Sequence, residues 1–156
     1  MQGAIVCRYL SFTDPRLGRT FRLPLVHIRL RHRNTSLRTD ALVDSGATAT
    51  FVPIDLMNVL GFDLRPEGEA QTNQRHKKQA AVGAGGRFET YVKKIDSIEV
   101  LKGMMVFCDF SNVTVLVPTR RDAIPPAVLG RDTIFRKFDI TYREDREQIV
   151  FRPAKY

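Results

Sequence analysis

Short apolar runs separated by polar or glycine-containing turns constrain the fold of this chain more than any other feature. Strand side chains alternate between two faces, so such runs are typical of strands packed on one core. Pro24 predicts an edge strand or a bulge in the second run, because proline has no N–H to donate to a neighbouring strand. The runs are residues 4–12, 20–31, 38–44, 87–101, 104–110, 113–118, 138–143 and 148–153.

Two segments predict helices. Residues 52–61 have an early proline and a final glycine, a pattern typical of helix ends, and Leu56, Val59 and Leu60 would form the buried face. In residues 130–138, Asp132 is the predicted N-cap, with one apolar side made of Ile134, Phe135 and Phe138. The chain is therefore predicted to be mainly β with one or two short helices.

The length of 156 residues predicts a single domain that can bury a core without disulfides or metals. Neither the two cysteines, Cys7 and Cys108, nor the three histidines have a metal-ligand spacing, so no metal or cofactor is expected. No run is long enough to cross a bilayer, and the short apolar N-terminus does not resemble a secretory signal. These features favour a soluble, cytoplasmic protein with no membrane partner.

The net charge of +8 raises the question of a nucleic-acid partner. The basic residues cluster in 29–38 and 73–79, between strand-like segments, where solvated loops are expected. No recognition helix or zinc spacing accompanies them. Solvated loops are therefore the preferred interpretation, and a basic nucleic-acid-binding β domain stays an alternative.

The stretch ALVDSGATATFVP, residues 41–53, places one carboxylate at the end of an apolar strand. Asp44 is followed by Ser45 and Gly46, and glycine allows a sharp turn and a close approach of another group. A half-buried carboxylate beside backbone donors is the environment of a group that holds or releases a proton. The alternative is a structural turn in which the aspartate bonds its own backbone.

A second glycine-rich stretch, within residues 79–92, lies between two strand-like arms. Its tip contains Gly83, Ala84, Gly85 and Gly86, which leaves many backbone states open. This pattern indicates either a surface hairpin with a loose turn or a mobile lid over a site.

The first stretch resembles the active-site signature of the retropepsin-like aspartic proteases, the single-domain relatives of retroviral protease. Residues 127–142, AVLGRDTIFRKFDITY, are similar to the late segment of that family, with the match carried by Val128, Leu129, Gly130 and Arg131. The stretch AVGAGGRF lies where the family has its flap hairpin. The resemblance implies a retropepsin-like domain over residues 20–156, with residues 1–19 as an extension or an extra strand.

Two departures from the family pattern bear on the site. Ser45 replaces the more frequent threonine but keeps the hydroxyl, whose usual role is to bridge across the dimer. Thr48 stands where many viral members have an acidic residue that pairs with the late arginine. Arg131 is therefore expected to find another partner, with Asp132 and Asp40 as the candidates.

The chemistry of this family uses two carboxylates around one water molecule. The chain has eleven aspartates, of which only Asp44 is followed by a hydroxyl residue and glycine. The resemblance therefore implies an aspartic endopeptidase that is active as a homodimer, best at acid or mildly acid pH, with Asp44 catalytic and Ser45 and Gly46 bracing the turn. The substrate would be an extended peptide or protein segment, and the expected lining residues are Ala47, Thr48, Val82, Gly83, Ala84 and Gly85.

A catalytically weak or inactive relative, acting as a dimerisation or peptide-binding module, is the alternative within the same fold. The intact Asp44-Ser45-Gly46-Ala47 sequence favours the enzyme.

Overall fold

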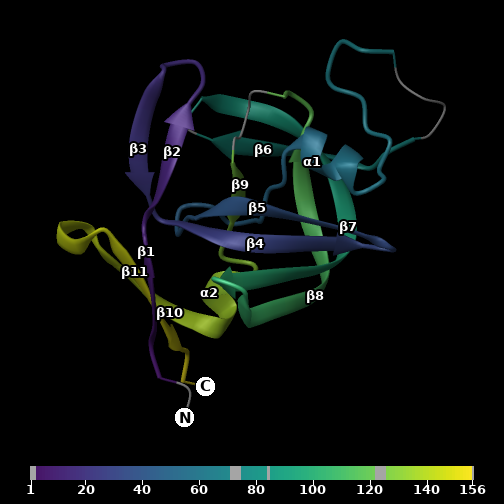
Figure 1. The fold of residues 1–156 in the computed structure, drawn as a ribbon. Coiled ribbons are helices and arrows are strands. Elements are labelled where there is room, and N and C mark those ends of the chain that lie inside the picture. Colours follow the sequence, from purple (N-terminus) through teal and green to yellow (C-terminus); the bar gives the residue numbers. More distant parts are fainter. Residues whose placement is uncertain (1–2, 71–74, 84, 122–125, 156) are drawn as a thin grey trace.

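The computed structural model describes residues 3–70, 75–83, 85–121 and 126–155. The prediction of a mainly β chain with two short helices is confirmed (Figure 1). The elements in chain order are β1 (Ile5–Arg8), β2 (Leu10–Asp14), β3 (Arg19–Leu23), β4 (Leu25–His32), β5 (Thr35–Val43), α1 (Ile54–Val59), β6 (Lys78–Gly83), β7 (Gly86–Lys102), β8 (Met105–Pro118), β9 (Ala127–Leu129), α2 (Ile134–Lys137), β10 (Phe138–Arg143), the single 3₁₀ turn η1 (Glu144–Arg146) and β11 (Gln148–Pro153).

A six-stranded sheet positions the candidate site. Its order is β6-β7-β4-β5-β9, and β8 pairs with the other edge of β7. The long strand β7 pairs with β6 near its start and with β4 near its end, so it joins the β6–β7 hairpin to the body of the sheet. Strands β5 and β9 run parallel, with Val43 opposite Leu129. This pairing places the segment after β9 beside the end of β5.

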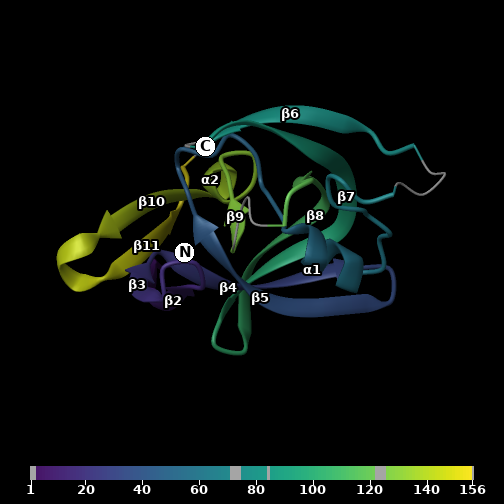
Figure 2. The same cartoon turned by 90° about the horizontal axis from the view of Figure 1, so that it is seen from above.

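Two smaller sheets are built from the ends of the chain (Figures 1 and 2). In the terminal sheet, β11 lies between β1 and β10, with Ile5 opposite Phe151 in the antiparallel register. Strands β2 and β3 form an antiparallel hairpin that runs across residue 19, where the sequence suggested a domain boundary. The N-terminal residues from Ile5 onward therefore contribute strands to both small sheets.

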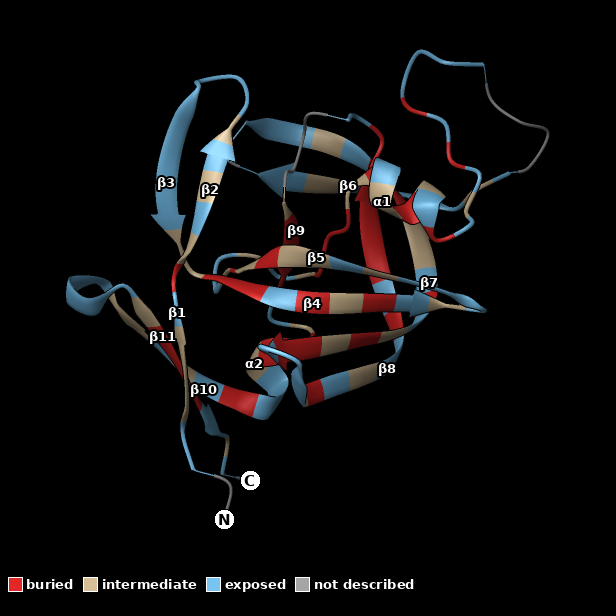
Figure 3. Ribbon diagram, in the orientation of Figure 1, coloured by how far each residue is buried: buried red, intermediate tan, exposed pale blue. Residues whose placement is uncertain are grey.

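The hydrophobic core lies between the inward faces of the strands and α1, as the buried segments in Figure 3 show. Its largest fully buried side chains include Tyr9, Tyr91, Phe151 and Met57. A second, smaller cluster is made of Phe51, Leu116 and Val128 and belongs to the candidate site below. No helix among the described residues is both long enough and apolar enough to span a membrane.

The expected single strand over residues 20–31 is wrong, because the chain breaks at Pro24. Strand β3 ends at Leu23 and pairs with β2, whereas β4 begins at Leu25 and lies between β5 and β7. Pro24 is thus neither on an edge strand nor in a bulge. It lies where the chain passes from one sheet to the next, and its carbonyl accepts a hydrogen bond from the N–H of Val43 at 3.0 Å.

The strands expected at 104–110 and 113–118 are one strand, β8, which continues through Asn112 in a left-handed conformation with φ of 52°. A single residue of positive φ bends a strand without ending its pairing, and the register with β7 holds on both sides of it. The separation into two runs is therefore a local bend.

The buried face expected for α1 is partly wrong. Val59 is 62% exposed, whereas Ile54, Met57 and Leu60 are buried. These three residues follow each other at a spacing of three, so they lie on one side of the helix. Gly61 follows the last helical turn with φ of 98°, as expected of a glycine that ends a helix.

The second helix is shorter than expected, because α2 covers only Ile134–Lys137 and Phe138 already belongs to β10. Asp132 is not its N-cap. Thr133 occupies that position, and the carboxylate of Asp132 instead accepts a hydrogen bond from the hydroxyl of Thr50 at 2.7 Å. The polar residue before the helix is thus used for a tertiary contact.

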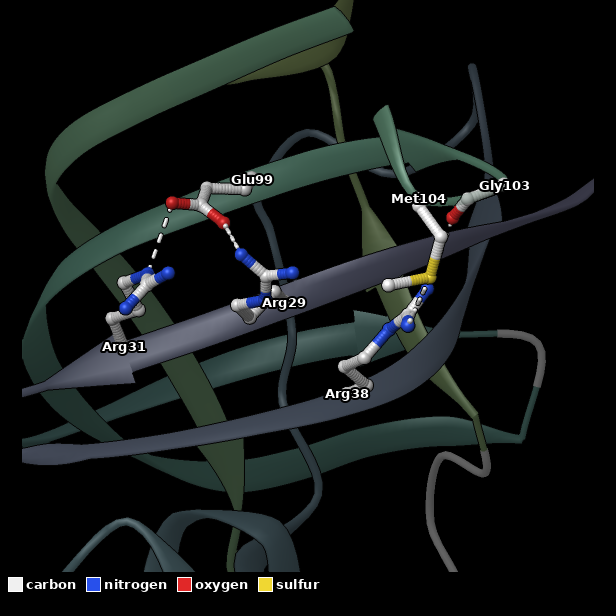
Figure 4. Close-up of polar contacts among 6 residues, drawn as sticks. All are labelled: Arg29, Arg31, Arg38, Glu99, Gly103 and Met104. Atoms are coloured by element: carbon white, nitrogen blue, oxygen red, sulfur yellow. Dashed lines mark hydrogen bonds and ion pairs between the residues drawn. The ribbon is translucent and has the colours of Figure 1, made fainter. Parts of the chain in front are cut away.

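The expectation that residues 29–38 form a solvated loop is also wrong, because most of them lie in β4 and β5. Glu99 of β7 accepts from Arg29 at 2.8 Å and from Arg31 at 2.9 Å (Figure 4). Arg38 donates to the carbonyl of Gly103 at 3.0 Å and contacts the sulfur of Met104. These arginines hold neighbouring strands and the β7–β8 turn together.

Candidate active site

Asp44 follows the last residue of β5 and begins the glycine-containing turn. Its N–H donates to the carbonyl of Leu129 at 3.2 Å, which continues the parallel pairing of β5 with β9. Its carboxylate oxygen Oδ1 accepts the N–H of Gly46 at 2.8 Å. A Cβ at position 46 would lie 3.1 Å from that oxygen, so glycine allows the backbone to approach the carboxylate closely. The half-buried carboxylate is thereby held in one orientation.

The residues after the turn cross between two strands. Phe51 exchanges two backbone hydrogen bonds of 2.9 Å with Val128, next to β8, where the N–H of Val52 donates to the carbonyl of Leu116 at 3.0 Å. The chain from Asp44 to Val52 is therefore attached to β9 and β8 at once. A side chain is positioned accurately when its supporting backbone is fixed in this way.

Gly130, directly after β9, packs against the backbone of this crossing segment. A Cβ at position 130 would lie 2.1 Å from the carbonyl oxygen of Ala49 and 2.9 Å from that of Ala47. The next N–H, of Arg131, donates to the carbonyl of Ala47 at 2.8 Å. Only glycine permits this approach of two backbones, which explains the glycine of the late segment.

A buried polar cluster around Thr50 supports the same contact. The Thr50 hydroxyl donates to Asp132 at 2.7 Å, accepts the N–H of Gly130 at 3.2 Å and lies 2.9 Å from the hydroxyl of Thr133. Thr50 and Thr133 are 1% and 3% exposed. Because buried polar groups are costly without partners, this cluster fixes the crossing segment against the chain before α2.

Tyr142 of β10 contacts the chain just before the turn that begins at Asp44. Its hydroxyl donates to the carbonyl of Val43 at 2.9 Å, one residue before Asp44. Burial, and then the negative charge of Asp44, raise the pKa of Tyr142 to about 12. The phenol therefore stays protonated and keeps its hydrogen bond over the whole range in which carboxylates act as acids or bases.

Asp44 faces a cavity of about 950 Å³. The turn after Asp44 lines one side, and the β6–β7 hairpin, in which Gly83 is opposite Gly86, lines the other. Apolar side chains lie between them, with the rings of Phe51 and Phe88 6.1 Å apart. A cavity lined by apolar side chains and a few polar groups is typical of a ligand-binding site.

The structure brings most of the expected site residues, catalytic, bracing and lining, to this cavity. They are Asp44, Gly46, Ala47, Thr48, Val82, Gly83 and Gly85. Ala84 lies outside the described residues. Ser45 is exposed and does not line the cavity, and no hydrogen bond of its side chain to another described residue is present. The roles assigned to these residues from the sequence stay predictions.

Sequence reasoning missed several residues of the site. Arg16, Arg87 and Arg120 line the cavity, as do Phe51, Leu116 and Val128. The apolar ones have the signal of ordinary core strands. The arginines come from three separate parts of the chain, so no local pattern could have joined them.

The expected partners of Arg131 are wrong. The carboxylate of Asp40 pairs with His27 at 2.6 Å, and that of Asp132 accepts from Thr50. The Arg131 side chain is exposed and forms no ion pair with any described residue. Across the described ranges, no group of three or more histidine, cysteine, aspartate or glutamate side chains is arranged to hold a metal ion.

No protein-family model and no curated protein sequence matches this chain. Among solved structures, the chain is similar to the crystal structure of a retropepsin-like aspartic protease from Rickettsia conorii. The match covers 96% of this chain and 90% of that one, with a TM-score of 0.52 and 15% sequence identity. At this identity the likeness concerns the fold. The chain has the single-domain retropepsin-like fold, and the prediction of that fold from the three sequence blocks is confirmed.

Proposed function

We propose that the chain is an aspartic endopeptidase that acts as a homodimer. The observation that carries the proposal is the position of Asp44. It is the one carboxylate among the described residues that line the 950 Å³ cavity. It follows the largely buried end of β5, in a turn held by the backbone hydrogen bonds of Asp44 and by the Gly46 N–H, which donates to the carboxylate. The retropepsin-like fold supports the same assignment.

In the proposed mechanism, a two-fold axis brings the Asp44 carboxylates of two chains to one water molecule. Two carboxylates about 3 Å apart share one proton, because like charges at that distance do not both ionise easily. The ionised carboxylate takes a proton from the water, which attacks the scissile carbonyl. The protonated one donates a hydrogen bond to the developing oxyanion, and a proton then passes to the leaving nitrogen. These steps need no metal or organic cofactor.

The remaining site residues have proposed supporting roles. Gly46 and Ala47 would hold the turn and leave room for the substrate, while the exposed hydroxyl of Ser45 would contact the partner turn. The β6–β7 hairpin, which carries Val82 and Gly83, would cover an extended peptide as a flap and pair with its backbone.

The terminal sheet is the proposed place of dimer contact. Strands β1 and β10 are its two edges, and neither has a second neighbour within the described chain. Open strand edges present unpaired N–H and C=O groups that pair readily with another chain. The free thiols of Cys7 and Cys108 suit a reducing compartment such as the cytoplasm, which is the proposed location.

The deciding experiment compares the wild type with Asp44→Asn and, as a matched control, Asp109→Asn, at an exposed aspartate outside the cavity. Each is incubated with a peptide library between pH 4 and 7, with and without a statine-type mimic of the transition state. We expect cleavage by the wild type and by Asp109→Asn, no cleavage by Asp44→Asn, and inhibition by the mimic. Equal cleavage by Asp44→Asn would remove Asp44 from the mechanism.

Sedimentation at micromolar concentration tests the dimer. A strictly monomeric chain that cleaves through Asp44 would refute the shared site. A dimer that binds peptides without cleaving them would identify the alternative, an inactive peptide-binding module.

A further inference from the structure

Among the described residues that line the cavity, the charged side chains are nearly all positive. They are Arg16, Arg87 and Arg120, with Asp44 as the one described carboxylate. The three arginines come from the β2–β3 turn, from β7 and from the chain just after β8. Because these elements are distant in the sequence, their convergence is a property of the folded chain.

Arg16 lies in the β2–β3 turn, where it is paired with Asp14. The Arg16 N–H donates to Oδ1 of Asp14 at 2.8 Å, and its guanidinium lies 3.3 Å from Oδ2. The N–H of Gly18 closes the turn on the carbonyl of Asp14 at 2.8 Å. The Asp14 side chain is only 13% exposed, whereas that of Arg16 is 62% exposed. The exposed Arg16 side chain therefore lines the cavity while it is paired with Asp14.

Arg87 lies in the opposite wall. It pairs in register with Val82 near the tip of the β6–β7 hairpin and is exposed. The neighbouring Phe88 points its ring toward Phe51, in the apolar middle of the cavity. Charged groups therefore lie around an apolar centre, on both the hairpin side and the N-terminal side.

We propose that this cavity selects acidic peptides, in which an apolar central segment is flanked by aspartate or glutamate side chains. The guanidinium groups would receive those carboxylates, because arginine presents a planar set of donors that fits a carboxylate. A homodimer would place two copies of each arginine around one site. The inference rests on the proposed function, since it assumes that a peptide occupies the cavity.

The expected effect is moderate because the arginines are exposed. An exposed charge pair contributes little, so each favourable pair should strengthen binding by about two- to fivefold. Several pairs acting together should separate acidic from basic peptides by at least about tenfold at low salt. Exposed pairs are screened by ions, so the preference should shrink strongly at 1 M salt.

The test uses a fluorescein-labelled octapeptide with two central phenylalanines and with glutamate, glutamine or lysine at the flanking positions. Binding to Asp44→Asn is measured by fluorescence anisotropy, and kcat/KM is measured with the wild type. We expect glutamate to be preferred over glutamine, and glutamine over lysine, in both measurements.

The variants Arg16→Glu, Arg87→Glu and Arg120→Glu should weaken the preference, and all three together should reverse it toward lysine. Arg33→Glu, an equal charge change in the β4–β5 turn outside the cavity, should leave it intact. Circular dichroism checks that each variant is folded, and Arg→Gln variants of the same residues serve as milder replacements.

The outcomes separate the two proposals. A preference in binding without any cleavage would support the acidic selection and refute the protease. Cleavage of all three peptides with equal kcat/KM would refute the selection and leave the protease intact. A preference that survives the triple reversal, or no binding of any peptide, would also overturn the selection.

Discussion

Replacing Gly130 by alanine is the sharpest structural test of how the turn after Asp44 is held. The added Cβ would lie 2.1 Å from the carbonyl oxygen and 2.5 Å from the carbonyl carbon of Ala49. Cβ contacts under 3.0 Å are essentially never observed. The neighbouring atoms belong to the backbone, so no side chain can rotate away. The crossing segment must move by roughly 1 Å, which a close-packed interior resists.

The cost follows from two contributions. Forcing extra volume into a packed site costs about 1–3 kcal/mol. The hydrogen bond from the N–H of Arg131 to the carbonyl of Ala47, 2.8 Å long, would be stretched, which costs about 1 kcal/mol more. We therefore expect Gly130→Ala to lower the free energy of unfolding by about 2–4 kcal/mol. The same displacement moves the Asp44 turn, so any peptide cleavage should fall as well.

Urea unfolding followed by circular dichroism measures this change, with Gly3→Ala as the matched control. A Cβ at position 3 meets no atom within 4 Å, so the control should behave as the wild type. A free energy of unfolding for Gly130→Ala within about 0.5 kcal/mol of the wild type would refute the reasoning, since surface changes without a packing conflict stay within that range.

Three further predictions concern polar groups of the same fold. Thr50→Val keeps the shape but removes the buried hydroxyl, which leaves the Gly130 N–H and the Asp132 carboxylate without this partner. The free energy of unfolding should therefore fall by about 1–3 kcal/mol in urea titrations. An unchanged midpoint would contradict this. Tyr142→Phe should abolish a phenol titration near pH 12. In the wild type, the stability that Tyr142 contributes should be lost as pH rises above 10, because the phenol of the unfolded chain ionises first. A Tyr142 phenol that titrates at its ordinary pKa would argue against the burial of Tyr142 beside Asp44. Burial and the charge of Lys93 lower the pKa of His76 below 6.5. As pH falls, the imidazole of the unfolded chain is therefore protonated first, and the free energy of unfolding should fall below pH 6.5. His76→Gln should flatten that part of the pH–stability curve, and identical curves would refute the assignment.

The sequence predicted the local features of the fold better than the contacts between distant residues. The strand runs, the glycine that ends α1 and the turn after Asp44 were predicted, because alternation, positive φ and glycine content are local properties of the chain. The buried face of α1 was not predicted correctly. Spacings of three and four residues fit several faces of a short helix, and only the core chose Ile54 and Met57 over Val59.

The support of the candidate site was largely invisible in the sequence. Tyr142 and Thr50 stand in ordinary strand and loop contexts, and nothing nearby indicates that they bond to Val43 and Asp132. Pro24 indicated that the strand is interrupted. That the chain passes from one sheet to another at this residue depended on which strands pair.

By itself, the sequence determined that the chain is mainly β and that one aspartate stands at a glycine turn. These follow from residue types and their spacing. Tertiary structure alone decided that Gly130 would meet the backbone of Ala49, and that Arg16 would share a cavity with Asp44 and the β6–β7 hairpin. These contacts join residues that are far apart in the chain. They depend on how all strands pair and pack together, which no local pattern specifies.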